Sequence, residues 1–132
     1  MNILLLNVIH PPLDKRVFQK IARSLRGAGH HIVSICPGDA TLPREHDGVG
    51  FIYISASPTK CARLRAIVQL VRTGRREPAD VYYAPEPESW VAALCLKALR
   101  GGRVVFDMHE HAPSEFAKFF PRPLRPYIAW LT

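Results

Sequence analysis

The run Asn2-Ile-Leu-Leu-Leu-Asn-Val-Ile9 carries the strongest structural signal in this chain. It is short and almost continuously apolar, which is typical of a central parallel strand that is buried on both faces. His10-Pro-Pro-Leu13 follows it. Proline can neither donate to a strand ladder nor continue a helix, so the run is expected to end in a loop there. We therefore predict a buried first strand whose end opens onto a proline-containing loop.

Beyond this strand, short apolar runs alternate with amphipathic segments. Further strands are predicted at His31–Cys36, Val49–Ser55, Val81–Ala84 and Arg103–Met108. Helices are predicted from Asp14, as N-cap, to Gly27, and at Lys60–Arg76, Ser89–Arg100, Ser114–Phe120 and Leu124–Thr132. The polar stretch Asp39 to Gly48 is expected to be a loop. This alternation indicates βαβ units with right-handed crossovers, and hence an α/β, Rossmann-like doubly wound parallel sheet of about five strands.

The composition fits one globular domain. The 132 residues are 48% hydrophobic and 22% charged, which excludes disordered and collagen-like classes. No run approaches the roughly 18 consecutive apolar residues that a membrane-spanning helix needs. The N-terminal run has neither a basic segment nor a small-residue cleavage site, so it is not expected to be a signal peptide. Three widely spaced cysteines without a CxxC motif indicate reduced thiols in a cytosolic protein.

The residues that could carry chemistry follow three of the predicted strands. His10, Asp14, Lys15 and Arg16 come after the first strand. Glu86 comes after the fourth strand, and Asp107, His109 and Glu110 come at the end of the fifth. Ligands of open α/β sheets bind beyond the carboxyl ends of the strands, where the strand order reverses. With the first strand central, these three segments are expected to converge on one rim.

Each of these residues also has a simpler interpretation. Lys15 and Arg16 could meet an anion or lie on a solvated helix face, and the loop before them has no glycine-rich phosphate motif of a dehydrogenase or a P-loop enzyme. His109 and His111 could chelate a metal, but no third ligand is spaced to join them, so no metal is expected. His109 is expected to serve acid–base work or hydrogen bonding to a substrate, and the alternative is that it caps its own loop. The carboxylates Glu86 and Glu88 suit recognition of sugar hydroxyls and suit the N-terminus of the following helix equally well, and Glu86 is the better candidate for a functional role.

The predicted helix Lys60–Arg76 is strongly basic. The chain has 18 Lys and Arg against 11 Asp and Glu, a formal charge of +7, which favours an anionic partner. We expect the apolar residues Leu64, Ile67, Val68 and Val71 to face inward. The cations could be a solvated face or could dock onto anionic lipid, and no recognition motif indicates nucleic acid. The candidates for facing a membrane are Lys60, Arg63, Arg65, Arg72, Arg75 and Arg76.

Three stretches together resemble GT4-type glycosyltransferases of the GT-B fold. They are His10-Pro-Pro-Leu-Asp14-Lys-Arg16-Val17, the Ala79–Glu88 stretch with its alanine-rich helix, and Gly102-Arg-Val-Val-Phe-Asp107-Met-His109-Glu110. In this order and spacing they cover nearly the whole chain. The family often has His and Asp where this chain has Pro85 and Glu86, so this loop departs from the family pattern.

The resemblance implies that residues 1–132 are the N-terminal, acceptor-binding half of a retaining enzyme that uses a nucleotide-sugar and needs no other cofactor. It implies that His109 lies near the transferred sugar with Glu110 beside it, and that Asp14 and Arg16 border the acceptor or phosphate. The acceptor would be lipid-linked or a polysaccharide of the cell envelope, and the protein would be cytoplasmic and peripheral to the membrane. The donor-binding C-terminal half is not present in these residues, so the fragment alone is expected to be inactive.

Two other interpretations remain open. The chain could be a non-catalytic interaction module, or one subunit of a split glycosyltransferase whose apolar C-terminal residues dock a partner. It could also be a flavodoxin-like ligand binder.

Overall fold

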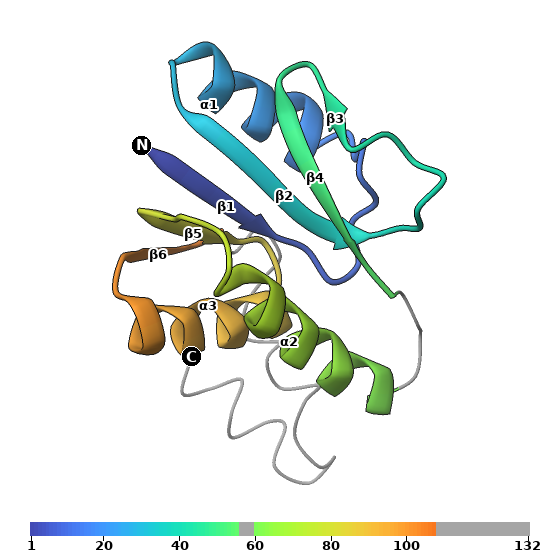
Figure 1. Ribbon diagram of the computed structural model, residues 1–132, viewed down its shortest axis with the longest axis vertical. Coiled ribbons are helices and arrows are strands. Elements are labelled where there is room, and N and C mark those ends of the chain that lie inside the picture. The colour runs from blue at the N-terminus through green and yellow to red at the C-terminus, as the bar shows by residue number, and fades with distance from the viewer. Residues whose placement is uncertain (56–59, 108–132) are drawn as a thin grey trace, which may run out of the picture.

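The computed structural model describes residues 1–55 and 60–107, without the side chains of residues 60 and 61. These residues form one six-stranded sheet in the order β3-β4-β2-β1-β5-β6 (Figure 1). The strands are β1 (Asn2–Leu6), β2 (His31–Pro37), β3 (Glu45–His46), β4 (Val49–Ile54), β5 (Val81–Ala84) and β6 (Arg103–Phe106). Every neighbouring pair is parallel except the β3–β4 pair. The predicted α/β class, with a Rossmann-like sheet, is confirmed.

Strand β1 lies at the centre of this sheet. It pairs with β2 on one side, Leu4 opposite Val33, and with β5 on the other, Leu4 opposite Tyr82. Leu4 is 1% exposed and Leu5 is fully buried, because helices cover both faces of the strand. The apolar run is therefore buried on both faces, as predicted. In the sheet, β5 and β6 lie together on one side of β1.

Alternate residues of β1 point into two separate cores. Leu4 and Leu6 pack with α2 (Lys60–Gly74) and α3 (Pro87–Arg100), which lie side by side on one face of the sheet (Figure 1). Ile3 and Leu5 pack with the helical segment on the other face, which consists of a π-helical part η1 (Val17–Ala22) and α1 (Arg23–Gly27). Two backbone bonds of η1, Gln19 N to Asp14 O and Ile21 N to Arg16 O, span five residues, so the predicted helix begins with a wider turn.

Strand β3, which was not predicted, corrects the prediction of a loop at Asp39–Gly48. Strands β3 and β4 form a hairpin in which His46 pairs with Val49, so Asp47 and Gly48 are its two turn residues. Both have positive φ, 51° and 73°, as a tight hairpin turn of this kind requires. Asp-Gly is the sequence signal for such a turn, so the strand could have been predicted from the Asp47-Gly48 pair.

The buried face of α2 matches the prediction in part: Ile67 and Val71 pack against the core as predicted, but Leu64 and Val68 do not. Ala66 and Leu70 are buried, whereas Leu64 is 65% exposed and Val68 is 58% exposed. Small residues let the helix pack closely: a Cβ at Gly74 would lie 2.8 Å from a methyl carbon of Leu96 on α3. Leu64 and Val68 therefore share the outward side of α2 with Arg65 and Arg72, and Arg75 follows in the turn directly after the helix. We name these five residues the outer face of α2. No helix in residues 1–55 and 60–107 is long and apolar enough to cross a membrane.

The turn between α3 and β6 supplies a test of backbone strain. Gly101 and Gly102 have φ of 76° and 93°, and only at Gly102 would a Cβ meet neighbours, Tyr82 Cε2 at 3.1 Å and the Asp80 carbonyl at 3.2 Å. Gly101→Ala is expected to lower the free energy of unfolding by about 1 kcal/mol, and Gly102→Ala by about 2–3 kcal/mol. Urea unfolding of both variants measures this. Gly27→Ala, where nothing lies near the added Cβ, is the control and is expected to be neutral or stabilising. Equal losses at Gly101 and Gly102 would contradict the prediction.

Candidate functional site

Glu86 anchors the loop that follows β1. Its side chain is buried, and its carboxylate accepts the backbone N–H of Val8 at 2.7 Å, of Ile9 at 3.0 Å and of His10 at 3.3 Å. These donors lie beyond the end of β1, where no neighbouring strand satisfies them, and this explains why the predicted strand to Ile9 ends at Leu6. Burial raises the pKa of Glu86 above its ordinary value, although the three N–H groups and His10 act in the opposite direction.

The same residue begins α3. Its backbone N–H donates to the Ser89 hydroxyl at 3.1 Å, and that hydroxyl donates back to the Glu86 carbonyl at 2.8 Å. Pro87 follows at the first helical position, which suits its fixed φ and missing N–H. The helix thus starts two residues earlier than the predicted Ser89. Glu86 joins the loop after β1 to the beginning of α3, and its role in binding sugar hydroxyls stays a prediction.

His10 lies between two carboxylates. Its Nδ1 is 3.4 Å from Asp14 Oδ2, and its Nε2 is 3.7 Å from Glu86 Oε1. The other oxygen of Asp14 accepts the N–H groups of Arg16 and Val17, both at 2.8 Å, so Asp14 caps the first turn as predicted. Burial tends to raise the pKa of Asp14, but these N–H groups and His10 outweigh it and lower the pKa. The structure therefore brings His10, Asp14 and Glu86 together.

Arg16 reaches across to the end of β6. Its Nη2 lies 2.5 Å from Asp107 Oδ2, and the Tyr83 hydroxyl donates to the same oxygen. Burial, and then the bond to Asp107, raise the pKa of Tyr83. The predicted anion-binding Arg16 is thus already paired with a carboxylate. Lys15, by contrast, is an exposed cation at the same rim.

Together these contacts bring the segments after β1, β5 and β6 to one edge of the sheet, as predicted. Asp107 is the last described residue there, and His109 and Glu110 lie outside the described residues. Charge at this rim is mixed, because three carboxylates lie among Arg16 and His10. The described residues hold no group of three His, Cys, Asp or Glu side chains that could bind a metal.

Two further polar residues of this edge were not singled out from the sequence. Tyr83 holds Asp107, and Asn7 is buried at the end of β1, where its Nδ2 donates to the Ser34 hydroxyl at 3.0 Å. Within the described part of the chain, Asn7 Oδ1 has no hydrogen-bond partner. Asn7 had a readable signal, because it is the one polar residue that interrupts Ile3–Ile9. Tyr83 had none, since tyrosine is common in buried strands.

The predicted membrane-facing residues do not form one group. Arg63 Nη1 lies 2.9 Å from Glu88 Oε1 in the first turn of α3, so Arg63 joins the two helices. Arg65, Arg72, Arg75 and Arg76 are exposed, and the side chain of Lys60 lies outside the description.

A family model described as a glycosyl transferase 4-like domain matches residues 15–132. No curated protein and no solved structure matches the chain significantly.

The pKa of Glu86 generates a prediction about stability. Because the folded-state pKa is raised, the folded protein holds this proton more tightly than the unfolded chain does. The stability that protonated Glu86 contributes is complete below the unfolded pKa of about 4.3 and is lost as the pH rises through the folded pKa. Glutamine does not titrate. The difference in free energy of unfolding, wild type minus Glu86→Gln, should therefore fall as the pH rises above about 4, as measured by urea unfolding at several pH values.

Asp14→Asn is the matched control. The pKa of Asp14 is lowered, so its contribution is present above the unfolded pKa and is lost as the pH falls. The corresponding difference for Asp14→Asn should rise with pH. Slopes of the same sign for the two variants would contradict the assignment for Glu86.

Proposed function

The chain belongs to the glycosyl transferase 4-like domain family, and we propose that it forms the acceptor-binding half of a retaining enzyme that transfers a sugar from a nucleotide-sugar to a lipid-linked or polysaccharide acceptor. One observation carries this proposal. The polar residues after β1, β5 and β6 meet at the carboxyl edge of the sheet, where open α/β proteins bind their ligands. The family supports transferase function in general, and the retaining chemistry, donor and acceptor are the proposal.

In this proposal the described residues shape the site and His109 acts in it. Glu86 holds the loop that carries His10, and Asp14 caps the turn that follows. Arg16 and Tyr83 fix Asp107, two residues before His109. We place His109 and Glu110 against the transferred sugar, where an imidazole can donate or accept a proton near neutral pH. The diphosphate leaving group would be stabilised electrostatically by a second, nucleotide-binding half.

Replacement of His109 tests this role. In extracts of cells that overproduce the full gene product containing this chain, we expect transfer of labelled sugar from nucleotide-sugars into lipid or polysaccharide. His109→Ala is expected to lower the rate by about 100-fold or more, because an acid–base group contributes about that much. His111→Ala removes an imidazole two positions away and serves as the control. Equal losses in both variants, or full activity of His109→Ala, would contradict the assignment.

A second function, docking onto an anionic membrane surface, is favoured by the outer face of α2. Leu64 and Val68 are among the exposed large apolar residues, and Arg65, Arg72 and Arg75 lie around them. Apolar side chains that enter a lipid interface, with cations beside them, are the features by which amphipathic helices bind anionic membranes. We propose that α2 lies on the inner surface of the plasma membrane, which would keep a lipid-linked acceptor near the site.

Vesicle binding tests this second proposal. The chain is expected to sediment with phosphatidylglycerol vesicles and much less with phosphatidylcholine vesicles. Leu64→Ser/Val68→Ser should weaken binding about tenfold, since two partly inserted apolar side chains are lost. The matched control is Val91→Ser/Leu94→Ser on α3, which removes two apolar residues that are exposed elsewhere. The same loss in both double variants, or equal binding to both vesicle types, would contradict the proposal.

A further inference from the structure

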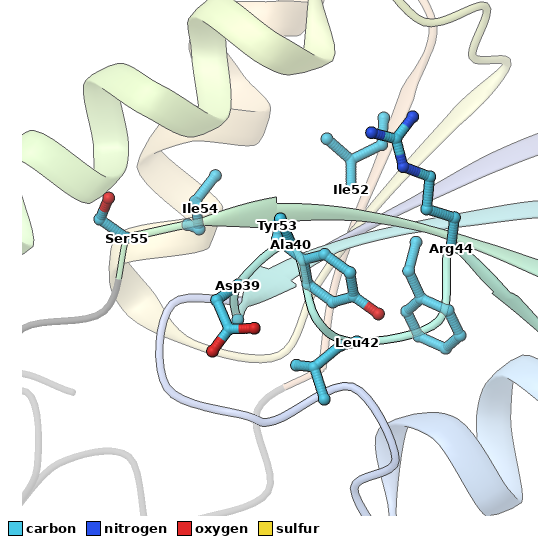
Figure 2. A pocket seen from close by; sticks show the side chains of 10 residues that line it. Asp39, Ala40, Leu42, Arg44, Ile52, Tyr53, Ile54 and Ser55 are labelled. Atoms are coloured by element: carbon cyan, nitrogen blue, oxygen red, sulfur yellow. The ribbon is translucent and has the colours of Figure 1, made fainter.

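The edge of the sheet at β4 is open over part of its length. Strand β3 pairs with β4 only at Val49 and Gly50, and the last backbone bond of the hairpin runs from Phe51 N to the Arg44 carbonyl. Beyond this bond, the loop after β2 and the second half of β4 border a hollow of about 420 Å³ (Figure 2). We name it the β4 edge cleft and define it by Asp39, Leu42 and Arg44 on the loop and by Ile52, Tyr53 and Ile54 on the strand.

Tyr53 presents its peptide groups to this cleft. The carbonyl of Ile54 accepts the N–H of Gly38 on the β2 side, and successive residues of a strand turn their peptide groups to opposite edges. The N–H and C=O of Tyr53 therefore point away from β2, and in the described part of the chain neither has a hydrogen-bond partner. An added strand would find one donor and one acceptor there.

The loop after β2 leaves this edge uncovered, because it turns onto the face of the sheet that carries the Tyr53 ring. The Tyr53 hydroxyl donates to the Pro43 carbonyl, and Leu42 and Pro43 lie with Pro11–Leu13 around a second, apolar hollow of about 260 Å³. Leu42 lines both hollows and keeps 36% of its surface exposed. A residue paired with Tyr53 would place its side chain on this same face, so an apolar side chain fits there.

Two charged residues mark the two ends of the cleft. Asp39 follows Gly38, which bonds to Ile54, so Asp39 lies toward the carboxyl end of β4. Arg44, which bonds to Phe51, lies at the other end of the cleft, beside Ile52 (Figure 2). The cleft therefore has a direction that is set by charge, negative toward the end of β4 and positive toward β3.

Both charges are available to a ligand. Asp39 accepts the hydroxyl of Thr41 and also its N–H at 2.9 Å, and these bonds lower the pKa of Asp39, which is therefore ionised. Neither Asp39 nor Arg44 forms an ion pair within residues 1–55 and 60–107, and Figure 2 shows the guanidinium well away from the carboxylate.

From this arrangement we infer that the β4 edge cleft binds an extended strand of a partner protein, antiparallel to β4, with a basic residue before and an acidic residue after the residue that pairs with Tyr53. An antiparallel strand has its N-terminal side at Asp39 and its C-terminal side at Arg44, and it continues the direction of β3. Main-chain bonds to Tyr53 supply affinity, and the flanking charges supply specificity. The inference goes beyond sugar transfer and does not depend on it.

Titration calorimetry of the 132-residue chain with the blocked peptide acetyl-Lys-Val-Leu-Val-Glu-amide tests the inference. We expect saturable binding, with ¹H–¹⁵N NMR shifts centred on residues 38–44 and 51–55. The peptide with exchanged charges, acetyl-Glu-Val-Leu-Val-Lys-amide, should bind at least about tenfold more weakly, because each end then meets a like charge. N-methylation of the leucine removes the N–H that pairs with the Tyr53 carbonyl and should weaken binding at least about fivefold.

Variants then assign the binding to the cleft. Arg44→Gln should weaken binding of the first peptide about threefold, and so should Asp39→Asn, which keeps an acceptor for Thr41. Arg44→Glu should bind acetyl-Lys-Val-Leu-Val-Lys-amide more tightly than the wild type does, a gain that misfolding cannot produce. Arg65→Gln, which removes an exposed cation on α2, is the control and should bind as the wild type does.

Several results would overturn the inference. They are the absence of saturable binding, equal affinity for the two charge orders, and no effect of N-methylation. Self-association of the chain in sedimentation that Arg44→Glu weakens would also overturn it, because the occupant would then be a second copy. None of these measurements needs a sugar donor or acceptor, so failure of the peptide to bind would leave the transferase proposal intact.

Discussion

The buried carboxylate of Glu86 is the constraint on which the candidate site depends. Three consecutive N–H groups beyond the end of β1 point at it, and each would be costly to bury without a partner, at about 1–3 kcal/mol. When a strand ends in the interior, the N–H groups that follow it need hydrogen-bond acceptors, and here the Glu86 side chain accepts all three. The loop that carries His10 and Asp14 therefore has a defined path, even though it contains two prolines and no secondary structure of its own.

Much of the sheet could be predicted from the sequence because its strands are short apolar runs bounded by proline and glycine. Strand Val81–Ala84 was predicted with the bounds that the structure has, and β1 was correctly placed at the centre. The misses have physical causes. The hairpin at Asp47-Gly48 lies within a polar segment, so hydrophobic periodicity does not detect it. On α2, the contact face uses Ala66 and Gly74 rather than the larger Leu64 and Val68, because the close approach to α3 favours small residues.

The sequence predicted where in the fold the candidate site lies better than it predicted which of its residues contact one another. The rule that ligands bind beyond the carboxyl ends of strands placed His10, Asp14 and Glu86 together, and the structure agrees. Which of them contact one another is a tertiary fact that spacing cannot show. Arg16 was predicted as a residue that could bind an anionic ligand. Its partner is instead Asp107, which is distant in sequence and becomes a neighbour only because β6 pairs with β5 in the sheet. The predicted roles of His109 and Glu110 stay predictions, since those residues lie outside the described ranges.

The short stretch Glu86–Glu88 holds two parts of the molecule at once. Glu86 accepts hydrogen bonds from the loop after β1, and two residues later Glu88 forms an ion pair with Arg63 on α2. Pro87 stiffens the link between them. A tilt of α2 against the sheet would thus pull on the first turn of α3 and, through it, on the peptide groups of Val8 to His10. The contacts that order this loop therefore also couple the two faces of the sheet. A displacement of α2 on one face would be transmitted to the loop that leads into η1 on the other face.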